Sequence, residues 1–305
     1  MGAMGDGSEN NQVDVRWSLL DLPAALIAGM RPRQATKNLF VLVAMVFANR
    51  FDRAATALLA FAIFWLASSS VYLLNDVADR EQDRAHPTKR NRPIASGRLP
   101  WPVGLIAGVM FGLGGVAAAF AVNLRFGSIT LLYLLLQAAY TLWLKHVVLV
   151  DVFAIAAGFV MRAIAGAWAI QVPISTWLLV CTLQLALFLA FGKRRHELVT
   201  LQEDAANHRR ILAQYSLPFL DQMISIVLGG LTVSYALYVI NSPTAAQHPH
   251  LAYTLPSVFY FIFRYLYLIH VEQKGGAPET ILIEDRPTQV NALIWIALVL
   301  GAMRS

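Results

Sequence analysis

Residues 54 to 97 read AATALLAFAIFWLASSSVYLLNDVADREQDRAHPTKRNRPIASG and join two opposite kinds of sequence. The first part, to about residue 75, is apolar and long enough to cross the roughly 30 Å hydrocarbon core of a bilayer as one helix. The second part, Asn75 to Gly97, is crowded with acids and bases. This junction predicts a membrane helix that carries a charged, functional segment at its end.

The acids of the charged segment have helical spacing. If the preceding helix continues, Asp76, Asp79 and Asp83 stand at i, i+3 and i+7 and share one face. Three such carboxylates repel one another unless a cation lies among them, and hard oxygen ligands suit Mg²⁺. The spacing therefore favours a metal site, although a solvated charged loop is the plainer alternative.

Bases follow the acids within a few turns. They can neutralise the phosphate charge of a metal-bound ligand, because guanidinium and ammonium groups form strong hydrogen bonds with phosphate. The bases are Arg84, Lys89, Arg90 and Arg92. The segment as a whole predicts a site for a phosphorylated substrate.

The composition is that of a membrane protein. Hydrophobic residues make up 57% of the chain and charged residues 14%, and the mean hydropathy is +0.56. We therefore expect an all-α polytopic membrane protein. The net charge of +6 is attributed to loops on the cytoplasmic side, so no nucleic-acid partner is expected. The single Cys181 excludes an intrachain disulfide and a cysteine-based zinc site.

The domain organisation is predicted to be simple. Residues 1–15 are polar and glycine-containing and are interpreted as a flexible tail, and 16–305 as a single transmembrane catalytic domain that opens with an interfacial helix at 17–29. Nine membrane spans are expected, at about 35–50, 54–75, 101–123, 126–144, 147–170, 175–193, 216–240, 251–271 and 288–303.

Basic residues predict the orientation of these spans. With the N-terminus inside, the outer loops and the C-terminus hold only four of the 24 basic residues, Arg50, Arg53, Arg125 and Arg304. The long polar loops at 76–100, 194–214 and 272–287 then lie on the cytoplasmic side. We expect a polar cavity that faces the cytoplasm.

Polar side chains inside apolar runs are costly and are candidates for function. Asp151 and Arg162 fall in the fifth span, where a structural ion pair is the alternative. Tyr140 and Lys145 fall at the inner end of the fourth span, where they could instead be an interfacial aromatic and a basic anchor.

Two further basic segments flank apolar runs. Lys193, Arg194 and Arg195 lie in GKRRHEL at the end of the sixth span and form either an orientation signal or a second phosphate-binding wall. Before the first span, Gln34, Lys37 and Asn38 share a helical face. They form either a ligand site or part of a patch that attracts anionic lipids.

These motifs resemble the UbiA superfamily of intramembrane prenyltransferases, which are nine-helix bundles. The match to the first family motif, NDxxDxxxD, consists of Asn75, Asp76, Asp79 and Asp83. Within the family, the chain is most similar to members that transfer a phosphoribosyl group to a polyprenyl phosphate such as decaprenyl phosphate. The matching stretches are 31–38, 71–97, Tyr140 with Lys145, RAIAG at 162–166 and 192–198.

One departure from the family pattern bears on the substrate. Ordinary prenyltransferases carry a second aspartate-rich motif where this chain has Lys193, Arg194 and Arg195. Cations at this place suit a donor with an extra phosphate, such as 5-phosphoribosyl 1-diphosphate (PRPP).

The resemblance implies a role for each candidate residue. Mg²⁺ would be held by Asp76 and Asp83, with Asp79 as a further catalytic carboxylate. Asn75 would orient a carboxylate or a ribose hydroxyl. The other substrate-binding residues would be Gln34, Lys37, Asn38, Lys89, Arg92, Tyr140, Lys145, Arg162, Lys193, Arg194 and Arg195.

The resemblance also implies the reaction and its partners. We expect transfer of a phosphoribosyl group from PRPP to polyprenyl phosphate in a bacterial plasma membrane, for arabinogalactan precursors of the cell wall. The alternatives are a conventional prenyltransferase of the same fold and a transporter of an anionic metabolite. The sequence leaves open the lipid chain length, association into a homo-oligomer and the role of the region after about residue 215.

Overall fold

The computed structural model describes residues 21–201, 210–272 and 284–304. Within these ranges every regular element is a helix, which confirms the all-α prediction. The predicted tail at 1–15 and the start of the predicted interfacial helix lie outside the described residues.

The helices follow one another with short connections. The first part of the chain forms α1 (Leu22–Gly29), η1 (Pro32–Leu42), α2 (Val43–Phe47), η2 (Phe51–Arg53), α3 (Ala54–Ala78), α4 (Arg80–Ala85) and η3 (Lys89–Asn91). The middle forms α5 (Trp101–Val122), α6 (Leu124–Leu142), η4 (Leu144–His146), α7 (Val150–Ala169) and α8 (Thr176–Leu201). The last part forms η6 (Arg210–Gln214), α10 (Leu217–Asn241), α11 (Pro243–Gln247), η7 (Pro249–Thr254), α12 (Leu255–His270) and α14 (Arg286–Arg304).

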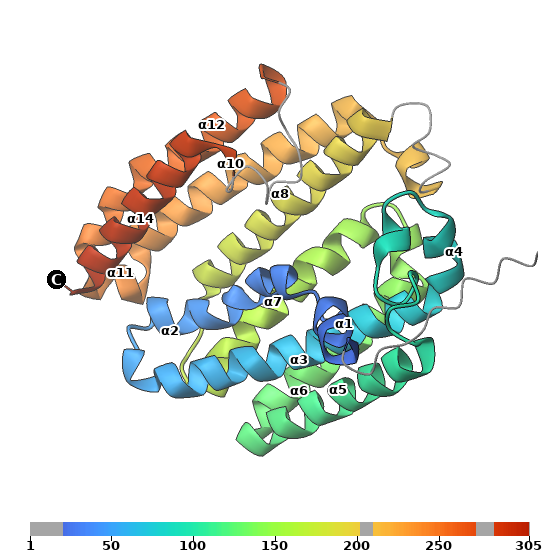
Figure 1. Cartoon of the computed structure of the whole chain (residues 1–305). Helices are drawn as coiled ribbons and strands as arrows, with labels where there is room; N and C mark the ends of the chain where they lie inside the picture. The colour runs from blue at the N-terminus through green and yellow to red at the C-terminus, as the bar shows by residue number, and fades with distance from the viewer. Residues whose placement is uncertain (1–20, 202–209, 273–283, 305) are drawn as a thin grey trace, which may run out of the picture.

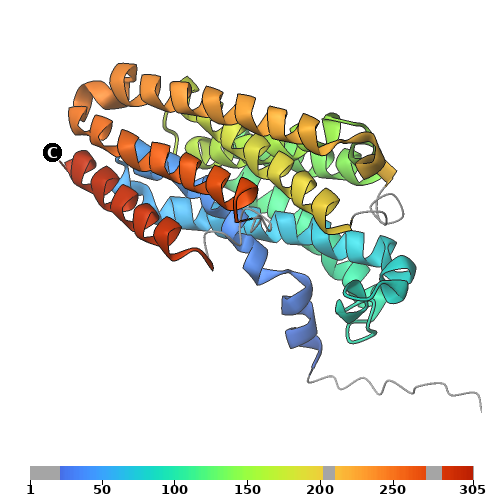
Figure 2. The ribbon, with the colours of Figure 1, turned by 90° about the horizontal axis from the view of Figure 1, so that it is seen from above.

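The long helices pack largely in chain order (Figure 1). Helix α3 packs on α5, α6 on α7, and α7 on α8, which in turn packs on α10, while α12 packs on α14. The largest apolar cluster joins α7, α8, α10 and α12 and includes Phe188, Ile224 and Tyr265. Helix α1 projects from the side of this bundle (Figure 2), which is the arrangement expected of an interfacial helix.

Among the described residues, six helical segments are long and apolar enough to cross a membrane. They are Phe51–Ala78, Trp101–Val122, Val150–Ala169, Thr176–Thr200, Leu217–Asn241 and Pro249–His270. Each corresponds to one of the nine predicted spans. The remaining three predictions correspond to the segment η1–α2, to α6 and to α14, so the count of nine stays a prediction.

The predicted first span at 35–50 is not a continuous α-helix. Its chain forms the 3-10 helix η1 and the five-residue α2. Segment η1 packs against α3 and α7, and a Cβ atom added to Gly166 of α7 would collide with the backbone oxygen of Val41. Gly166 therefore permits a close approach of two backbones. This contact between distant parts of the chain was not visible in the local sequence.

The charged segment begins almost as the spacing predicted. Helix α3 ends at Ala78, and Asp79 separates it from α4. The amide of Asp79 still donates to the Asn75 oxygen and that of Asp83 to the Asp79 oxygen, both at 2.8 Å. Because this hydrogen bonding continues across the break, the two ends of the motif remain on one side of the helix.

Candidate active site

Two carboxylates and two guanidinium groups form a cluster at the end of α3. Asp76 and Asp83 are buried, and Nη1 of Arg92 donates to both, at 3.1 Å from Asp76 Oδ1 and 2.7 Å from Asp83 Oδ2. Nη2 of Arg31 donates to Asp76 Oδ1. We call these four residues the carboxylate cluster. It unites both ends of the aspartate motif with a base from the preceding segment and a base from the following one.

The donor set of the cluster fits Mg²⁺. Both carboxylates lie within hydrogen-bonding distance of one nitrogen atom, and Asp79 is half-buried beside them at the helix break. Among the described residues no group of three or more His, Cys, Asp or Glu side chains could hold a metal. Two carboxylates with further positions left to phosphate and water suit Mg²⁺, which seldom takes an all-protein ligand set.

A cavity of about 230 Å³ opens next to this cluster. Its wall includes Tyr72, which lies one helical turn before Asp76 on α3 and carries the Arg31 guanidinium over its ring at 5.1 Å. The other polar side chains of the wall are Gln34, Lys37, Tyr133, Gln137, Tyr140, Arg162 and Lys193. Three of these are cations and none is an acid, so the cavity is suited to an anion.

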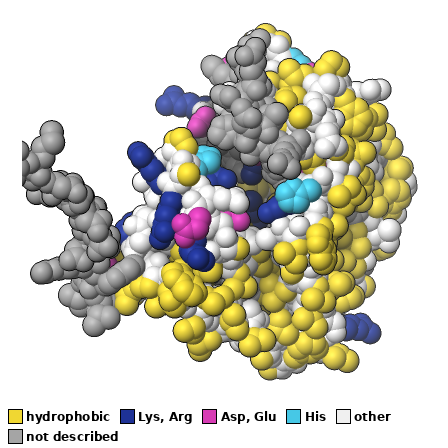
Figure 3. All heavy atoms as spheres, turned by 90° about the vertical axis from the view of Figure 1, so that its right-hand side faces the viewer, with side chains coloured by type: hydrophobic (Ala, Val, Ile, Leu, Met, Phe, Trp, Pro, Cys, Tyr) yellow, Lys and Arg dark blue, Asp and Glu magenta, His cyan; other side chains and the backbone are white. Residues whose placement is uncertain are grey.

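The view onto this end of the bundle shows the same distribution of charge (Figure 3). Lys and Arg side chains gather around a hollow, with Asp and Glu on one side of it, and much of the neighbouring surface is hydrophobic. We call the cavity lined by the residues of this wall the cationic pocket. The C-terminal ends of α3 and α8, which contribute to its wall, lie at the end of the bundle near α4, opposite α11 and the C-terminus (Figure 1).

Arg162 is buried in the pocket wall among neutral partners. Its Nε donates to Asn38 Oδ1 at 2.8 Å, its Nη1 to the Gly158 oxygen at 2.9 Å and its Nη2 to the Tyr133 hydroxyl at 2.7 Å. No carboxylate pairs with it among the described residues. A buried guanidinium without a counterion leaves its charge available to an anionic ligand.

Three other predicted residues lie around the pocket rather than in its wall. Asn38 is buried and bridges Arg162 to the Ser68 hydroxyl, so it positions the cation. Asn75 accepts a hydrogen bond at 3.1 Å from the Thr141 hydroxyl at the end of α6. Lys145 is half-buried on η4, just beyond that helix.

Lys89 is exposed on η3, at the outer side of the charged segment. The structure therefore does not bring Lys89 into the pocket wall with Lys37 and Lys193. Arg92, three residues later, is the base of this segment that reaches the carboxylates.

The predicted wall of three adjacent cations is divided by the geometry of α8. Lys193 lines the cationic pocket. Arg194 instead points into the protein, where its Nε binds Asp151 Oδ2 at 2.8 Å and its Nη1 binds Glu197 Oε2 at 2.7 Å. Arg195 pairs with Asp221 of α10. Neighbouring residues point about 100° apart on a helix, so three in a row cannot face one ligand.

Asp151 belongs to a network of hydrogen bonds and ion pairs within the protein. The hydroxyl of Tyr215 donates to Asp151 Oδ1 and accepts from the Leu149 amide, both at 2.8 Å. Burial raises the pKa of Tyr215 to about 12, so its hydroxyl keeps the proton that it donates. We call Asp151, Arg194, Glu197 and Tyr215 the buried network. It realises the ion-pair alternative for Asp151, with Arg194 rather than Arg162 as the partner.

Sequence reasoning missed several side chains of the site. Tyr133 and Gln137 were not predicted, although they stand at i and i+4 on α6 with the predicted Tyr140 at i+7, and all three line the pocket. A polar stripe at helical spacing within an apolar run was the available signal. Arg31 and Tyr72 carried no such pattern, because their roles depend on contacts between η1 and α3.

The chain matches a known protein family over most of its length. The sequence profile of the UbiA prenyltransferase family matches residues 38–281. The chain belongs to this family. It is accordingly a transferase, and family membership argues against the transporter alternative.

Two mycobacterial relatives, each similar over nearly the whole chain, carry the name of the same activity. The chain is 33% identical over 298 residues to the decaprenyl-phosphate phosphoribosyltransferase of Mycolicibacterium smegmatis, covering 93% of each chain. It is 34% identical over 295 residues to that of Mycobacterium tuberculosis, covering 92% of this chain and 96% of the relative.

Solved structures share the fold. A UbiA homologue from Archaeoglobus fulgidus, bound to GPP and Mg²⁺, superposes with a TM-score of 0.68 at 16% identity, covering 92% of this chain and 100% of that one. A structure from work on digeranylgeranylglyceryl phosphate synthase gives 0.65 at 17% identity, covering 93% and 100%.

Proposed function

We propose that this protein transfers the 5-phosphoribosyl group of PRPP to a polyprenyl phosphate. The observation that carries the proposal is a pocket with three cations and no acid in its wall, beside two buried carboxylates. A donor with a diphosphate and a 5-phosphate matches a site that offers metal ligands on one side and positively charged side chains on the other. The mycobacterial relatives are named decaprenyl-phosphate phosphoribosyltransferases, which supports the same transferred group and the same kind of acceptor.

In this mechanism the donor spans both parts of the site. Asp76 and Asp83 would hold Mg²⁺, which when bound neutralises charge on the leaving diphosphate. Lys37, Arg162 and Lys193 bind the remaining phosphate charge, and Tyr133 and Tyr140 offer hydroxyls to the sugar and its phosphate. Arg92 and Arg31 lie against the carboxylates, within reach of an incoming phosphate.

The reaction itself needs no general base. The bond between the anomeric carbon and the diphosphate oxygen breaks, and the diphosphate leaves with the electron pair. A bond forms between that carbon and an oxygen of the lipid phosphate, which is already ionised at neutral pH. The protein's task is therefore to position two anions and to stabilise their charge.

The acceptor is a lipid, and the fold gives it a route. Apolar helices surround the site, so a polyprenyl tail can stay in the bilayer while its phosphate meets the donor at the membrane interface. We propose a bacterial plasma membrane with the site on the cytoplasmic side, as the distribution of basic residues predicts. The product would serve arabinogalactan synthesis in the cell wall.

The donor decides between this reaction and its main alternative. Purified protein in detergent would be incubated with Mg²⁺, polyprenyl phosphate and PRPP labelled in the ribose, and the organic phase would be counted. We expect labelled lipid that depends on both Mg²⁺ and polyprenyl phosphate. Unlabelled lipid, together with prenyl transfer from a prenyl diphosphate to an aromatic acceptor, would refute the proposal.

That alternative rests on one specific observation, the close fold similarity to a UbiA homologue bound to GPP. A prenyl diphosphate also needs metal-binding carboxylates. It lacks an additional phosphate for Lys37, Arg162 and Lys193, which makes it the weaker match to the cationic pocket.

A further inference from the structure

A second cavity lies at the opposite end of the bundle from the carboxylate cluster. It measures about 530 Å³, and Arg50 in its wall directly precedes η2 and α3. Helix α3 has 25 residues, which at the usual rise correspond to about 37 Å, so this cavity and Asp76 lie near opposite ends of a membrane-length helix. The cavity is thus separate from the site of transfer.

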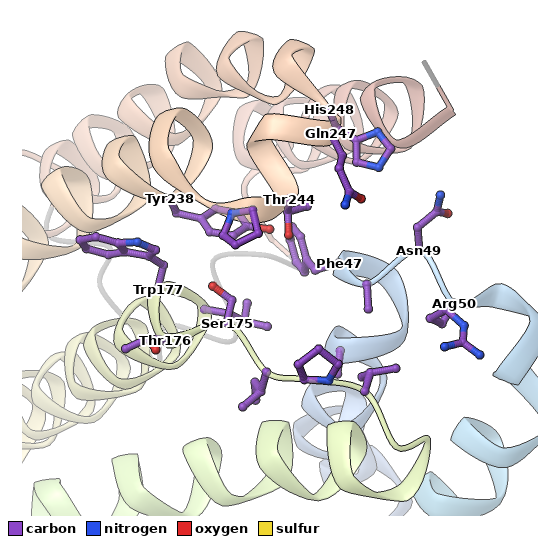
Figure 4. Close-up of a pocket in the computed structure, with 17 residues that line it drawn as sticks. Phe47, Asn49, Arg50, Ser175, Thr176, Trp177, Tyr238, Thr244, Gln247 and His248 are labelled. Atoms are coloured by element: carbon purple, nitrogen blue, oxygen red, sulfur yellow. The ribbon is translucent and has the colours of Figure 1, made fainter.

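Three parts of the chain form the wall of this second cavity (Figure 4). They are the end of α2 with Asn49 and Arg50, the connection from Val172 into the first turn of α8, and the end of α10 with α11. The polar side chains that face it include Asn49, Arg50, Ser175, Tyr238, Gln247 and His248. As in the cationic pocket, the wall contains no acid.

Two buried polar atoms of this wall have no hydrogen-bond partner among the described residues. They are the hydroxyl of Tyr238 and Nδ1 of His248. Tyr238 is only 2% exposed, and its side chain lies near that of Thr244 in the cavity wall (Figure 4). Buried polar groups are nearly always satisfied in native proteins. Two unsatisfied atoms at one cavity therefore indicate a polar ligand.

The remaining groups determine the charge of that ligand. Thr176, Trp177 and Leu178 form the first turn of α8 and line the cavity. Amides of a first turn have no partner within their own helix, and they carry partial positive charge. Arg50 binds Asp52 through Nε and Nη2, both at 2.8 Å, which leaves Nη1 uncommitted among the described residues. These donors and a wall without acids favour an anion.

We propose that this second cavity binds a phosphate ester, supplied by an anionic lipid of the leaflet opposite the site of transfer. The cavity lies at the level of helix ends, where the head groups of a bilayer lie. Phe47, Ile174 and Trp177 add apolar wall beside the polar groups, which suits the first carbons of a lipid chain. Free phosphate shares the recognised group and is the other source that a test must separate.

The test measures binding without using activity. Full-length protein in detergent is unfolded thermally in the presence of phosphatidylglycerol, of diacylglycerol with the same tails, and of inorganic phosphate. We expect phosphatidylglycerol to raise the midpoint by several degrees and diacylglycerol to leave it unchanged, because a ligand stabilises the state that binds it.

Two variants locate the effect in the cavity. Tyr238→Phe keeps the ring and removes only the unsatisfied hydroxyl, so the unliganded protein should remain folded. Arg50→Gln removes the uncommitted cation. Each should weaken phosphatidylglycerol binding about tenfold, as expected for one hydrogen bond to a charged group. Arg304→Gln is the matched control, since Arg304 is an exposed cation near the same end and outside the cavity wall.

The outcomes separate the two sources of phosphate. A shift with phosphatidylglycerol alone, reduced in both variants and kept in Arg304→Gln, supports the lipid. An equal shift with inorganic phosphate supports the site with a soluble source. The proposal is overturned if phosphatidylglycerol shifts the thermal midpoint equally in the parent, both cavity variants and the control. It is also overturned if neither phosphatidylglycerol nor inorganic phosphate shifts the midpoint. Because the readout is thermal, the result is independent of whether PRPP is the donor.

Discussion

The carboxylate cluster and the buried network contain the same kinds of side chain but differ in how far they are closed. In the cluster, Asp76 and Asp83 are buried, while the side chains of Arg31 and Arg92 keep 24% and 27% of their exposure. In the network, the Arg194 side chain is 1% exposed and that of Asp151 is fully buried. Arg31 and Arg92 can therefore exchange their partners without unfolding of the protein around them, whereas Arg194 cannot.

This difference in exposure indicates that the carboxylate cluster has a role in function and that the buried network has a role in stability. A partly exposed arginine can leave a carboxylate for a phosphate, since water and ligand replace the lost contact. A fully buried arginine cannot, because the carboxylate that it leaves would be an unpaired charge in a medium of low dielectric constant. The cluster is therefore suited to exchange ligands, and the network holds the ends of α7 and α8 in place. The following predictions are ordered from the largest expected effect to the smallest.

Removing charge from the cluster should abolish transfer. Asp76→Asn and Asp83→Asn keep the shape of the side chain but lose the metal-binding charge, so the rate of phosphoribosyl transfer should fall by about 1,000-fold or more. The thermal midpoint should stay near that of the parent, because Arg31 and Arg92 reach water. Asp52→Asn, at the opposite end of α3, is the control. Full activity in either variant would contradict the proposal that Asp76 and Asp83 bind the metal ion.

Breaking the buried network should act on stability. Asp151→Asn leaves the Arg194 guanidinium with one acidic partner, and we expect a loss of about 3 kcal/mol in the free energy of unfolding. Denaturant or thermal unfolding in detergent measures it.

The matched control for the network is the neighbouring pair of Arg195 with Asp221, whose carboxylate side chain is 31% exposed. Asp221→Asn should cost less than about 1 kcal/mol, as surface pairs do. If the two substitutions cost the same, burial is not what distinguishes these ion pairs.

A single cation of the pocket should affect binding of the donor. Lys193→Gln removes one phosphate contact, so the KM for PRPP should rise about tenfold while kcat changes little. Arg286→Gln, an exposed cation at the start of α14, controls for the overall charge. A fall in kcat at constant KM would contradict a role in binding the ground state of the donor.

The smallest effect is expected at Tyr215. Tyr215→Phe deletes the hydroxyl that joins Asp151 to the Leu149 amide, which should cost about 1 kcal/mol. Burial raises the pKa of this hydroxyl to about 12 in the folded protein. The difference in free energy of unfolding between parent and variant should therefore be constant below about pH 10, the ordinary pKa, and should decline between about pH 10 and pH 12. Equal stability of parent and variant at neutral pH would show that the hydroxyl does not stabilise the folded protein.

Much of this comparison could be read from local patterns. The spacing of Asp76 and Asp83 predicted a shared face, and both indeed contact Arg92. The apolar runs predicted nine membrane spans, and six of them correspond to helices of membrane length among the described residues. The stripe of Tyr133, Gln137 and Tyr140 was equally available in the sequence. These features depend on periodicity along one helix, which the sequence states directly.

Other features depended on the rotation of helices about one another. Lys193, Arg194 and Arg195 form one basic run in the sequence, yet they serve the cationic pocket, the buried network and a pair with Asp221. Asn38 and Arg162 meet because Gly166 lets η1 approach α7. Neither result follows from local spacing.

By itself, the sequence determined that the chain is a helical membrane protein with a charged segment at the end of one apolar helix, because hydrophobicity and side-chain period act over neighbouring residues. Only the tertiary structure decided which charged side chains stay accessible and which are buried in ion pairs. That choice depends on packing between helices far apart in the chain, where burial sets the cost of leaving a charge without a partner.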